Sequence, residues 1–217
     1  MKKLAIFDLD GTLLNTIYDL GEACNYALRK MGFNQHPIPA YHFMVGNGVR
    51  KLIERAQPDA DEKTIDELLS IFREYYDLHC MDDTRPYPGI PELLQELIEK
   101  NVAIAVASNK YQNAVTRIVE HYFPDVPFVS IQGQLDGRPS KPDPSIIFSI
   151  LAEHPTPKTD VLYIGDSGVD METARRACVE SIGVSWGFRP VSELRQAYAD
   201  NIVSAPSEIL KFLSDPF

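Results

Sequence analysis

The 217-residue sequence has few cysteines, a shortage of basic residues and no long apolar run. Its three cysteines, Cys24, Cys80 and Cys178, lie far apart and form no Cys-x-x-Cys or Cys/His pattern, which argues against a disulfide framework or a zinc site. The net charge of −10 disfavours a nucleic-acid-binding surface. No apolar stretch has the length of a transmembrane helix or of a signal-peptide core. We therefore expect a cytoplasmic protein with reduced thiols that binds neither nucleic acid nor membranes.

Short apolar segments alternate with amphipathic helical segments along most of the sequence. Strands are expected at residues 3–7, 102–107, 128–131, 161–164, 181–184 and 202–203. Apolar residues at helical spacing predict helices around residues 93–98, 112–122, 144–153, 171–178 and 206–213. Strands that alternate with helices indicate the α/β class, with a doubly wound, Rossmann-like parallel sheet.

The segment from Asn15 to Asp83 has a different pattern. Its apolar residues recur at helical spacing in three stretches, near Ile17, Val49 and Ile65, and no convincing strand interrupts them. Asp61 is a suitable N-cap for the third helix. We predict an inserted α-helical cap domain at residues 15–83 and an α/β core domain formed by residues 1–14 and 84–217.

Polar residues follow the apolar runs of three predicted strands. Asp8 and Asp10 follow the first, Ser108 and Asn109 follow the second, and Asp166 follows the fourth. Ligands of such sheets bind beyond the carboxyl ends of the strands, so these residues are expected to converge. Two carboxylates as crowded as Asp8 and Asp10 require a cation or a shared proton.

Four segments together resemble, in order and spacing, the motifs of the haloacid-dehalogenase-like phosphohydrolase superfamily. They are Phe7-Asp8-Leu9-Asp10-Gly11-Thr12-Leu13-Leu14, Ser108-Asn109, Ser140-Lys141-Pro142-Asp143-Pro144 and Gly165-Asp166-Ser167-Gly168-Val169-Asp170. The resemblance implies a core of this type with a helical cap. It also implies a Mg²⁺ ion bound by the Asp8 carboxylate, the Asp10 backbone carbonyl and the Asp166 carboxylate.

The same resemblance gives roles to the polar residues. Asp8 is the expected nucleophile, which forms an aspartyl-phosphate. Asp10 is the expected general acid and base, and an aspartate at its position favours phosphate-ester hydrolysis over carbon–halogen cleavage. Asp170, four residues after Asp166, is expected on the same helix face, where it would orient the metal waters and Lys141.

The phosphoryl group is expected to contact Ser108, the Asn109 amide and Lys141. Thr12, next to Gly11 as in the phosphatases of the superfamily, is also counted as a substrate-binding residue.

The cap segment is the expected source of substrate choice. Val45–Ala56 resembles the cap of phosphoglycolate phosphatases, and Gly46-Asn47-Gly48 at a helix start offers amides to a small anion, assisted by Arg50. The alternative is that the glycines only form a turn and Arg50 is solvated. Asn15 departs from the aspartate usual in that group, at the entry into the cap.

The expected function is magnesium-dependent hydrolysis of a small phosphate ester, 2-phosphoglycolate first, by a monomer or homodimer. The alternatives are a phosphosugar mutase resembling β-phosphoglucomutase, or a nucleotidase, pyrophosphatase or general sugar-phosphate phosphatase. A non-catalytic phosphate-binding regulator ranks last, because all four motifs carry the expected residue types.

Overall fold

The computed structural model describes residues 1–214 and contains a six-stranded parallel sheet in the order β5-β4-β1-β6-β7-β8. The strands are Leu4–Phe7 (β1), Ala103–Tyr111 (β4), Phe128–Gln134 (β5), Val161–Gly165 (β6), Glu180–Val184 (β7) and Asn201–Val203 (β8). The predicted α/β class with a parallel sheet is therefore confirmed.

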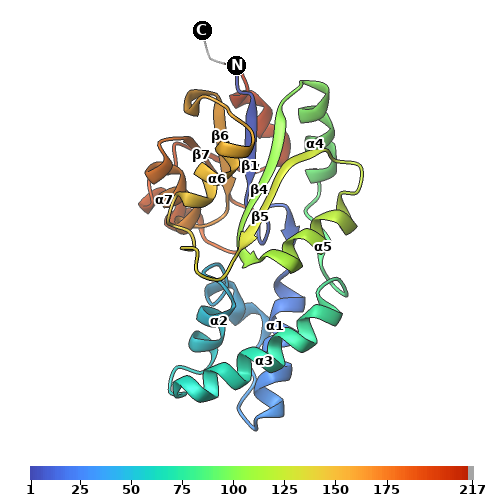
Figure 1. Cartoon of the computed structure of the whole chain (residues 1–217), viewed down its shortest axis with the longest axis vertical. Coiled ribbons are helices and arrows are strands. Elements are labelled where there is room, and N and C mark those ends of the chain that lie inside the picture. The colour runs from blue at the N-terminus through green and yellow to red at the C-terminus, as the bar shows by residue number, and fades with distance from the viewer. Residues whose placement is uncertain (215–217) are drawn as a thin grey trace.

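Strand β1 lies at the centre of the sheet, between β4 and β6 (Figure 1). Its residues are fully buried, and alternate residues belong to two hydrophobic clusters on opposite faces of the sheet. Leu4 and Ile6 share one cluster with Ile147 of the helix Ser145–Glu153 (α6), whereas Ala5 and Phe7 belong to the other. Burial on both faces explains why this strand has no polar alternation.

Helices cover both faces of the sheet. They are Ile90–Glu99 (α4), Gln112–Tyr122 (α5), Ser145–Glu153 (α6), Gly168–Ala177 (α7) and Val191–Gln196 (α8), with short 3₁₀ segments at Lys158–Asp160 and Pro206–Phe212. None of the described helices is long and apolar enough to cross a membrane.

A group of helices lies below the sheet in the view of Figure 1, near the carboxyl ends of the strands. They are Ile17–Lys30 (α1), the 3₁₀ segment Ile38–Phe43, Val49–Ala56 (α2) and Glu62–His79 (α3). Asp61 caps α3 as predicted, since its side chain accepts a hydrogen bond of 2.8 Å from the Thr64 amide. Leu28 and Phe72, from α1 and α3, are buried together in the core cluster.

The chain enters and leaves this helical segment through two short strands that pair with each other. Leu14–Asn15 (β2) and Arg85–Pro86 (β3) are antiparallel. Next to them, the buried Asp19 carboxylate accepts hydrogen bonds from the Asp83 amide and from the amide and hydroxyl of Thr84. The prediction that Asn15–Asp83 contains no strand is therefore wrong at Asn15, because a two-residue strand has no periodicity to detect.

Strand β4 is longer than predicted. It was expected to end at Ala107, but it continues to Tyr111, which pairs with Gln134 of β5 after a register shift. Ser108 and Asn109 therefore lie in an irregular part of the strand and not in a turn after it. Polar residues can belong to the end of a strand when the neighbouring strand continues beside them and the pairing resumes after an irregularity.

Candidate active site

Residues from four segments converge at the carboxyl ends of β1, β4 and β6. Asp8 follows β1, Asp166 follows β6, and Asp170 lies in the first turn of α7. Each of these three buried residues offers an oxygen, and the three oxygens lie within 4.8 Å of one another. We call these residues the carboxylate cluster.

Asp8 uses only one of its two oxygens in contacts with the protein. Oδ1 accepts a 2.7 Å hydrogen bond from the Leu9 amide and lies 2.9 Å from Nζ of Lys141. Within residues 1–214, no donor reaches Oδ2. Burial and the charge of Asp170 raise the pKa of Asp8 to about 7, against the opposing effect of Lys141. The carboxylate therefore has one oxygen available and lacks full charge compensation.

Asp166 is held by backbone groups. Its Oδ2 accepts a 2.7 Å hydrogen bond from the Phe188 amide. The backbones of Gly11 and Gly187 approach so closely that a Cβ at either position would come within 2.3 Å of an Asp166 side-chain atom. Burial, followed by the charges of Asp170 and Asp8, raises the pKa of Asp166 well above its usual range. Its orientation is thus fixed although its charge is not neutralised.

Both oxygens of Asp170 are already used. Oδ2 accepts from the Ser167 amide (3.1 Å) and hydroxyl (2.6 Å), which forms a capping box at the start of α7. Oδ1 accepts from Lys141 (2.8 Å) and from the Tyr163 hydroxyl (3.2 Å). Asp166 precedes the helix, so the prediction that Asp166 and Asp170 share a helix face is wrong. They meet because the chain turns at Ser167.

Lys141 is 3% exposed and contacts Asp8, Asp170 and the Ala107 carbonyl. The side chain of Asn109 holds the Lys141 backbone, because it accepts from the Lys141 amide (2.8 Å) and donates to its carbonyl (3.1 Å). The same amide group also donates to the Gly46 carbonyl (3.1 Å). Asn109 thus connects β4, the Lys141 loop and the helical segment.

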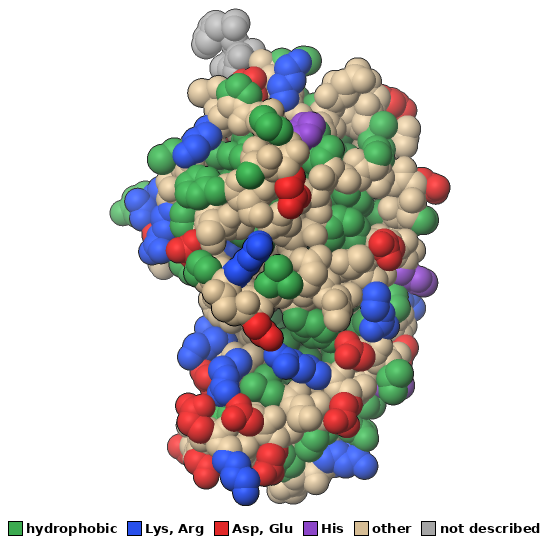
Figure 2. All heavy atoms as spheres, viewed as in Figure 1, with side chains coloured by type: hydrophobic (Ala, Val, Ile, Leu, Met, Phe, Trp, Pro, Cys, Tyr) green, Lys and Arg blue, Asp and Glu red, His purple; other side chains and the backbone are tan. Residues whose placement is uncertain are grey.

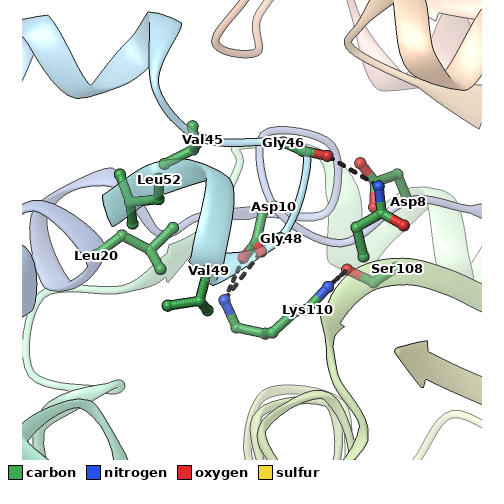
Figure 3. Close-up of a pocket in the computed structure, with 11 residues that line it drawn as sticks. Asp8, Asp10, Leu20, Val45, Gly46, Gly48, Val49, Leu52, Ser108 and Lys110 are labelled. Carbon is green, nitrogen blue, oxygen red and sulfur yellow. Dashed lines mark hydrogen bonds and ion pairs between the residues drawn. The ribbon is translucent and has the colours of Figure 1, made fainter. Parts of the chain in front are cut away.

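Asp10 is not part of the carboxylate cluster. Nζ of Lys110 lies 2.9 Å from each of its two carboxylate oxygens, and the Thr16 hydroxyl donates to Oδ1 at 2.7 Å. We call this the Asp10–Lys110 pair (Figure 3). The crowding that the sequence predicted between Asp8 and Asp10 is therefore relieved by a lysine on the Asp10 side.

Lys110 and Thr16 are site residues that were not predicted from the sequence. Lys110 follows Ser108-Asn109 directly, so the available signal was its position two residues after Ser108 on an extended chain. Thr16 lies six residues after Asp10, just before α1, and has no pattern that distinguishes it from a helix-start residue.

A cavity lies between this site and the helical segment (Figure 3). Its apolar walls come from the helical segment, and its polar walls come mainly from the core. The lining residues are Asp8, Asp10, Leu20, Val45, Gly46, Gly48, Val49, Leu52, Ser108, Asn109 and Lys110. The predicted residues Gly46 and Gly48 thus lie at the cavity, with φ values of +107° and +82° that favour glycine.

Four of the predicted substrate-binding residues are not among the described residues that line this cavity. One is Lys141, whose side chain contacts Asp8 and Asp170. Arg50 instead contacts Glu62 and Asp66 on the outer surface, where Figure 2 shows acidic and basic side chains gathered over α2 and α3. The Asn47 side chain accepts a hydrogen bond from Arg55. The buried Thr12 hydroxyl has no hydrogen-bond partner in the described part of the chain.

Two other arginines hold the loop that carries Gly46 and Gly48. Arg55 donates to the Met44 carbonyl at 2.7 Å, and Arg189 donates to the Val45 carbonyl at 2.9 Å. These arginines therefore position the loop backbone, a role that the sequence analysis assigned to no residue.

The donor set of the carboxylate cluster fits a magnesium ion. Mg²⁺ prefers carboxylate oxygens and binds through one or two of them, together with waters and substrate phosphate. Asp8 Oδ2 is free, Asp166 is fixed by its other oxygen, and three carboxylates face one lysine. Burial and the charge of Asp170 raise the pKa of both Asp8 and Asp166, and a cation bound here would favour their ionised forms.

Comparisons with known proteins agree with this arrangement. A family described as haloacid dehalogenase-like hydrolase matches residues 5–184. The chain is 29% identical to a phosphoglycolate phosphatase of Aquifex aeolicus, over 98% of this chain and 97% of the relative. It is 32% identical to one of Agrobacterium fabrum, over 88% and 84%. A crystal structure described as a predicted phosphoglycolate phosphatase of Haemophilus somnus superimposes with a TM-score of 0.91, at 27% identity and 98% coverage of both chains.

Proposed function

The chain belongs to the haloacid dehalogenase-like hydrolases and is a phosphatase of that family, and from this premise we propose that it hydrolyses 2-phosphoglycolate with Mg²⁺ through an aspartyl-phosphate. The observation that carries the proposal is that Asp8, within the buried carboxylate cluster, has its Oδ2 free. Asp10 lies outside this cluster and is held by Lys110. The names of the curated relatives support the choice of substrate.

Asp8 is the nucleophile of the first half-reaction. Its Oδ2 attacks phosphorus, a bond from Asp8 to phosphorus forms, and the bond to the ester oxygen breaks. Asp10, in its acid form, gives its proton to the departing alkoxide. In the second half-reaction Asp10 takes a proton from water, which attacks phosphorus and releases Asp8 and inorganic phosphate. The ester is thereby converted into an alcohol and phosphate.

The neighbouring residues bind the phosphoryl group and hold the reacting carboxylates. Ser108, the Asn109 amide and Lys141 receive the phosphoryl oxygens. Asp8, the Asp10 carbonyl and Asp166 would hold the metal ion. When bound, Mg²⁺ offsets negative charge on the phosphoryl oxygens. Asp170 keeps Lys141 in place.

Residues 15–83 act as a cap over a core formed by residues 1–14 and 84–217. The contacts of Gly46 with Asn109 and of Val45 with Arg189 support a closed arrangement in which water is excluded from the site. The loop of Gly46, Asn47 and Gly48 contacts the substrate, whereas the outward contacts of Arg50 leave it no direct role.

The test is phosphate release with Mg²⁺ across 2-phosphoglycolate, sugar phosphates, nucleoside monophosphates and pyrophosphate. The expected result is a clear preference for 2-phosphoglycolate that is lost in Asp8→Asn and on removal of the metal. An even preference across the panel would leave a general phosphatase. Isomerisation of a hexose phosphate with little free phosphate would make the protein a mutase. Phosphate binding without any turnover would overturn the enzymatic proposal.

A further inference from the structure

Two lysines are buried at the site, and the proposed reaction uses only Lys141 directly. The Lys110 side chain is 2% exposed, and its ammonium lies 4.8 Å from the centroid of the Tyr76 ring of α3 in addition to its contacts with Asp10. Burying an ammonium is costly unless it gains strong interactions. The position of Lys110, between the core and α3, therefore calls for a functional explanation.

Lys110 contributes the positive charge of the cavity. It is the only cation among the described residues that line this cavity, since Lys141 lies on the side of Asp8 and Asp170. Much of the remaining wall is apolar and consists of Leu20, Val45, Val49 and Leu52. In a protein of net charge −10, an anionic group of a substrate needs a local cation of this kind.

The chemistry places the leaving group beside Lys110. In an in-line displacement, the ester oxygen leaves from the face of phosphorus opposite Asp8. That oxygen must lie near Asp10, which protonates it. The atoms attached to it then extend past Asp10 into the cavity that Gly48, Val49 and Lys110 also line. Figure 3 shows the Lys110 ammonium beside the Asp10 carboxylate there.

We propose that Lys110 is a specificity-determining residue that binds an anionic group, a carboxylate, on the leaving alcohol. The carboxylate lies within two or three atoms of the ester oxygen. This inference rests on the proposed phosphatase function and adds the residue that recognises the substrate. An ammonium has three N–H donors, and the two oxygens of Asp10 leave capacity for a further acceptor.

The apolar walls select against other leaving groups. A sugar would place several hydroxyls against Leu20, Val49 and Leu52, which offer no hydrogen bonds from their side chains. A short carboxylate-bearing alcohol has one polar end, which Lys110 can bind, and a methylene that the walls can contact. The cavity therefore suits a small anionic leaving group.

The experiment compares two esters that differ only in this charge. 2-Phosphoglycolate carries a carboxylate where 2-hydroxyethyl phosphate carries a neutral CH₂OH group. The measured quantity is kcat/KM for 2-phosphoglycolate divided by kcat/KM for 2-hydroxyethyl phosphate. We expect Lys110→Met to lower this ratio at least about tenfold, because it removes one partner of a buried charge pair. Lys110→Arg keeps the charge and should preserve most of the ratio. Lys51→Met removes an exposed cation of α2 outside the cavity and should leave the ratio unchanged.

An equal fall in kcat/KM for both esters in Lys110→Met would overturn the inference, because Lys110 would then act only by positioning Asp10 or by stabilising the fold. If turnover by the variant is too slow to measure, the affinity for glycolate in the presence of Mg²⁺ is measured instead, by calorimetric titration of the wild type and the variant. Glycolate should bind the wild type and at least about tenfold more weakly to Lys110→Met; equal binding would overturn the inference. Absence of phosphate release from either ester by the wild type would contradict the proposed function instead, and glycolate titration would still test Lys110.

Discussion

The carboxylate cluster and the Asp10–Lys110 pair lie next to each other and differ in charge balance. The cluster has three carboxylates and one lysine, and the pKa values of Asp8 and Asp166 are raised. The pair has one carboxylate, one lysine and the hydroxyl of Thr16. The first region has more negative than positive charge, whereas in the second the carboxylate and the ammonium balance each other. One active site thus combines a region with unbalanced charge and a region whose charges the protein itself pairs.

The two regions also differ in their surroundings. Asp166 and Asp170 of the cluster are enclosed by core elements, the end of β6 and the start of α7, whereas Asp8 also lines the cavity. The pair shares its cavity with Val49 and Leu52 of α2. We therefore expect changes in the cluster to affect the chemical step for every substrate, and changes beside the pair to affect substrate choice.

The largest expected effect is that of Asp8→Asn. Loss of the nucleophile should reduce kcat by about 10⁴-fold or more, by analogy with other nucleophile deletions. The same change removes one of three crowded charges, so the metal-free variant should unfold at a higher temperature than the wild type. Phosphate release and thermal unfolding in a chelator measure the two effects. A metal-free variant less stable than the wild type would contradict the charge imbalance of the cluster.

The next expected effect compares the two buried lysines. Lys141→Met leaves Asp8 and Asp170 without their cation and should lower the free energy of unfolding by about 3–5 kcal/mol. Lys110→Met should cost less, because the Asp10 side chain is 17% exposed and keeps its hydrogen bond from Thr16. Urea unfolding without metal provides the comparison. An equal loss of unfolding free energy in the two variants would show that the carboxylates of the two regions are equally desolvated.

The pH dependence of metal-free stability should reveal the cluster as well. The pKa of Asp8 is about 7 in the folded protein and near 3.8 in the unfolded chain, so the folded state holds the extra proton between these values. Stability should therefore fall as the pH rises through this window. The contribution of Asp8 is obtained as the difference between the wild type and Asp8→Asn.

Magnesium should reverse this trend. At a fixed concentration that equals 100 times its dissociation constant at pH 8, the ion should stabilise the wild type by about 2.7 kcal/mol at that pH. The same concentration should stabilise it less at pH 5, because binding requires ionised carboxylates. Thermal unfolding with and without Mg²⁺ at both pH values measures this. A stabilisation independent of pH would argue against Asp8 and Asp166 as ligands.

The smallest expected effect is that of Thr16→Val. The variant loses the 2.7 Å hydrogen bond to Asp10, which should lower the free energy of unfolding by about 1 kcal/mol and kcat by less than about tenfold. Because Lys110 still holds both oxygens of Asp10, Mg²⁺ affinity should not change. Metal titration is the control, and a weakened affinity would show that the two regions are coupled.

The sequence was sufficient to predict the sheet and the convergence of the carboxylates. Short apolar runs that end in Asp8 and Asp166 encode both strand and site, because parallel strands meet at one edge. The role of Lys110 could not be predicted in this way. It depends on the continuation of β4 beyond Ala107 and on the approach of Tyr76 from a helix 34 residues earlier in the sequence.

Arg50 illustrates a second limit. Its position after Gly46-Asn47-Gly48 suggested a ligand contact, but the rotation of α2 about its axis is determined by burial of Leu52, Ile53 and Ala56. That packing turns Arg50 towards Glu62 and Asp66. The orientation of a short helix thus depends on tertiary contacts that local sequence does not specify.

The pairing of β2 with β3 brings the two ends of the helical segment next to each other. Asn15 lies opposite Arg85 and Leu14 opposite Pro86, as in the stem of a hairpin. A tight turn could join these strands in place of the whole segment, so the entropy of loop closure places little constraint on what is inserted there. The sheet could therefore carry helical segments of different length and sequence between the same two strands, without any change in the carboxylate cluster.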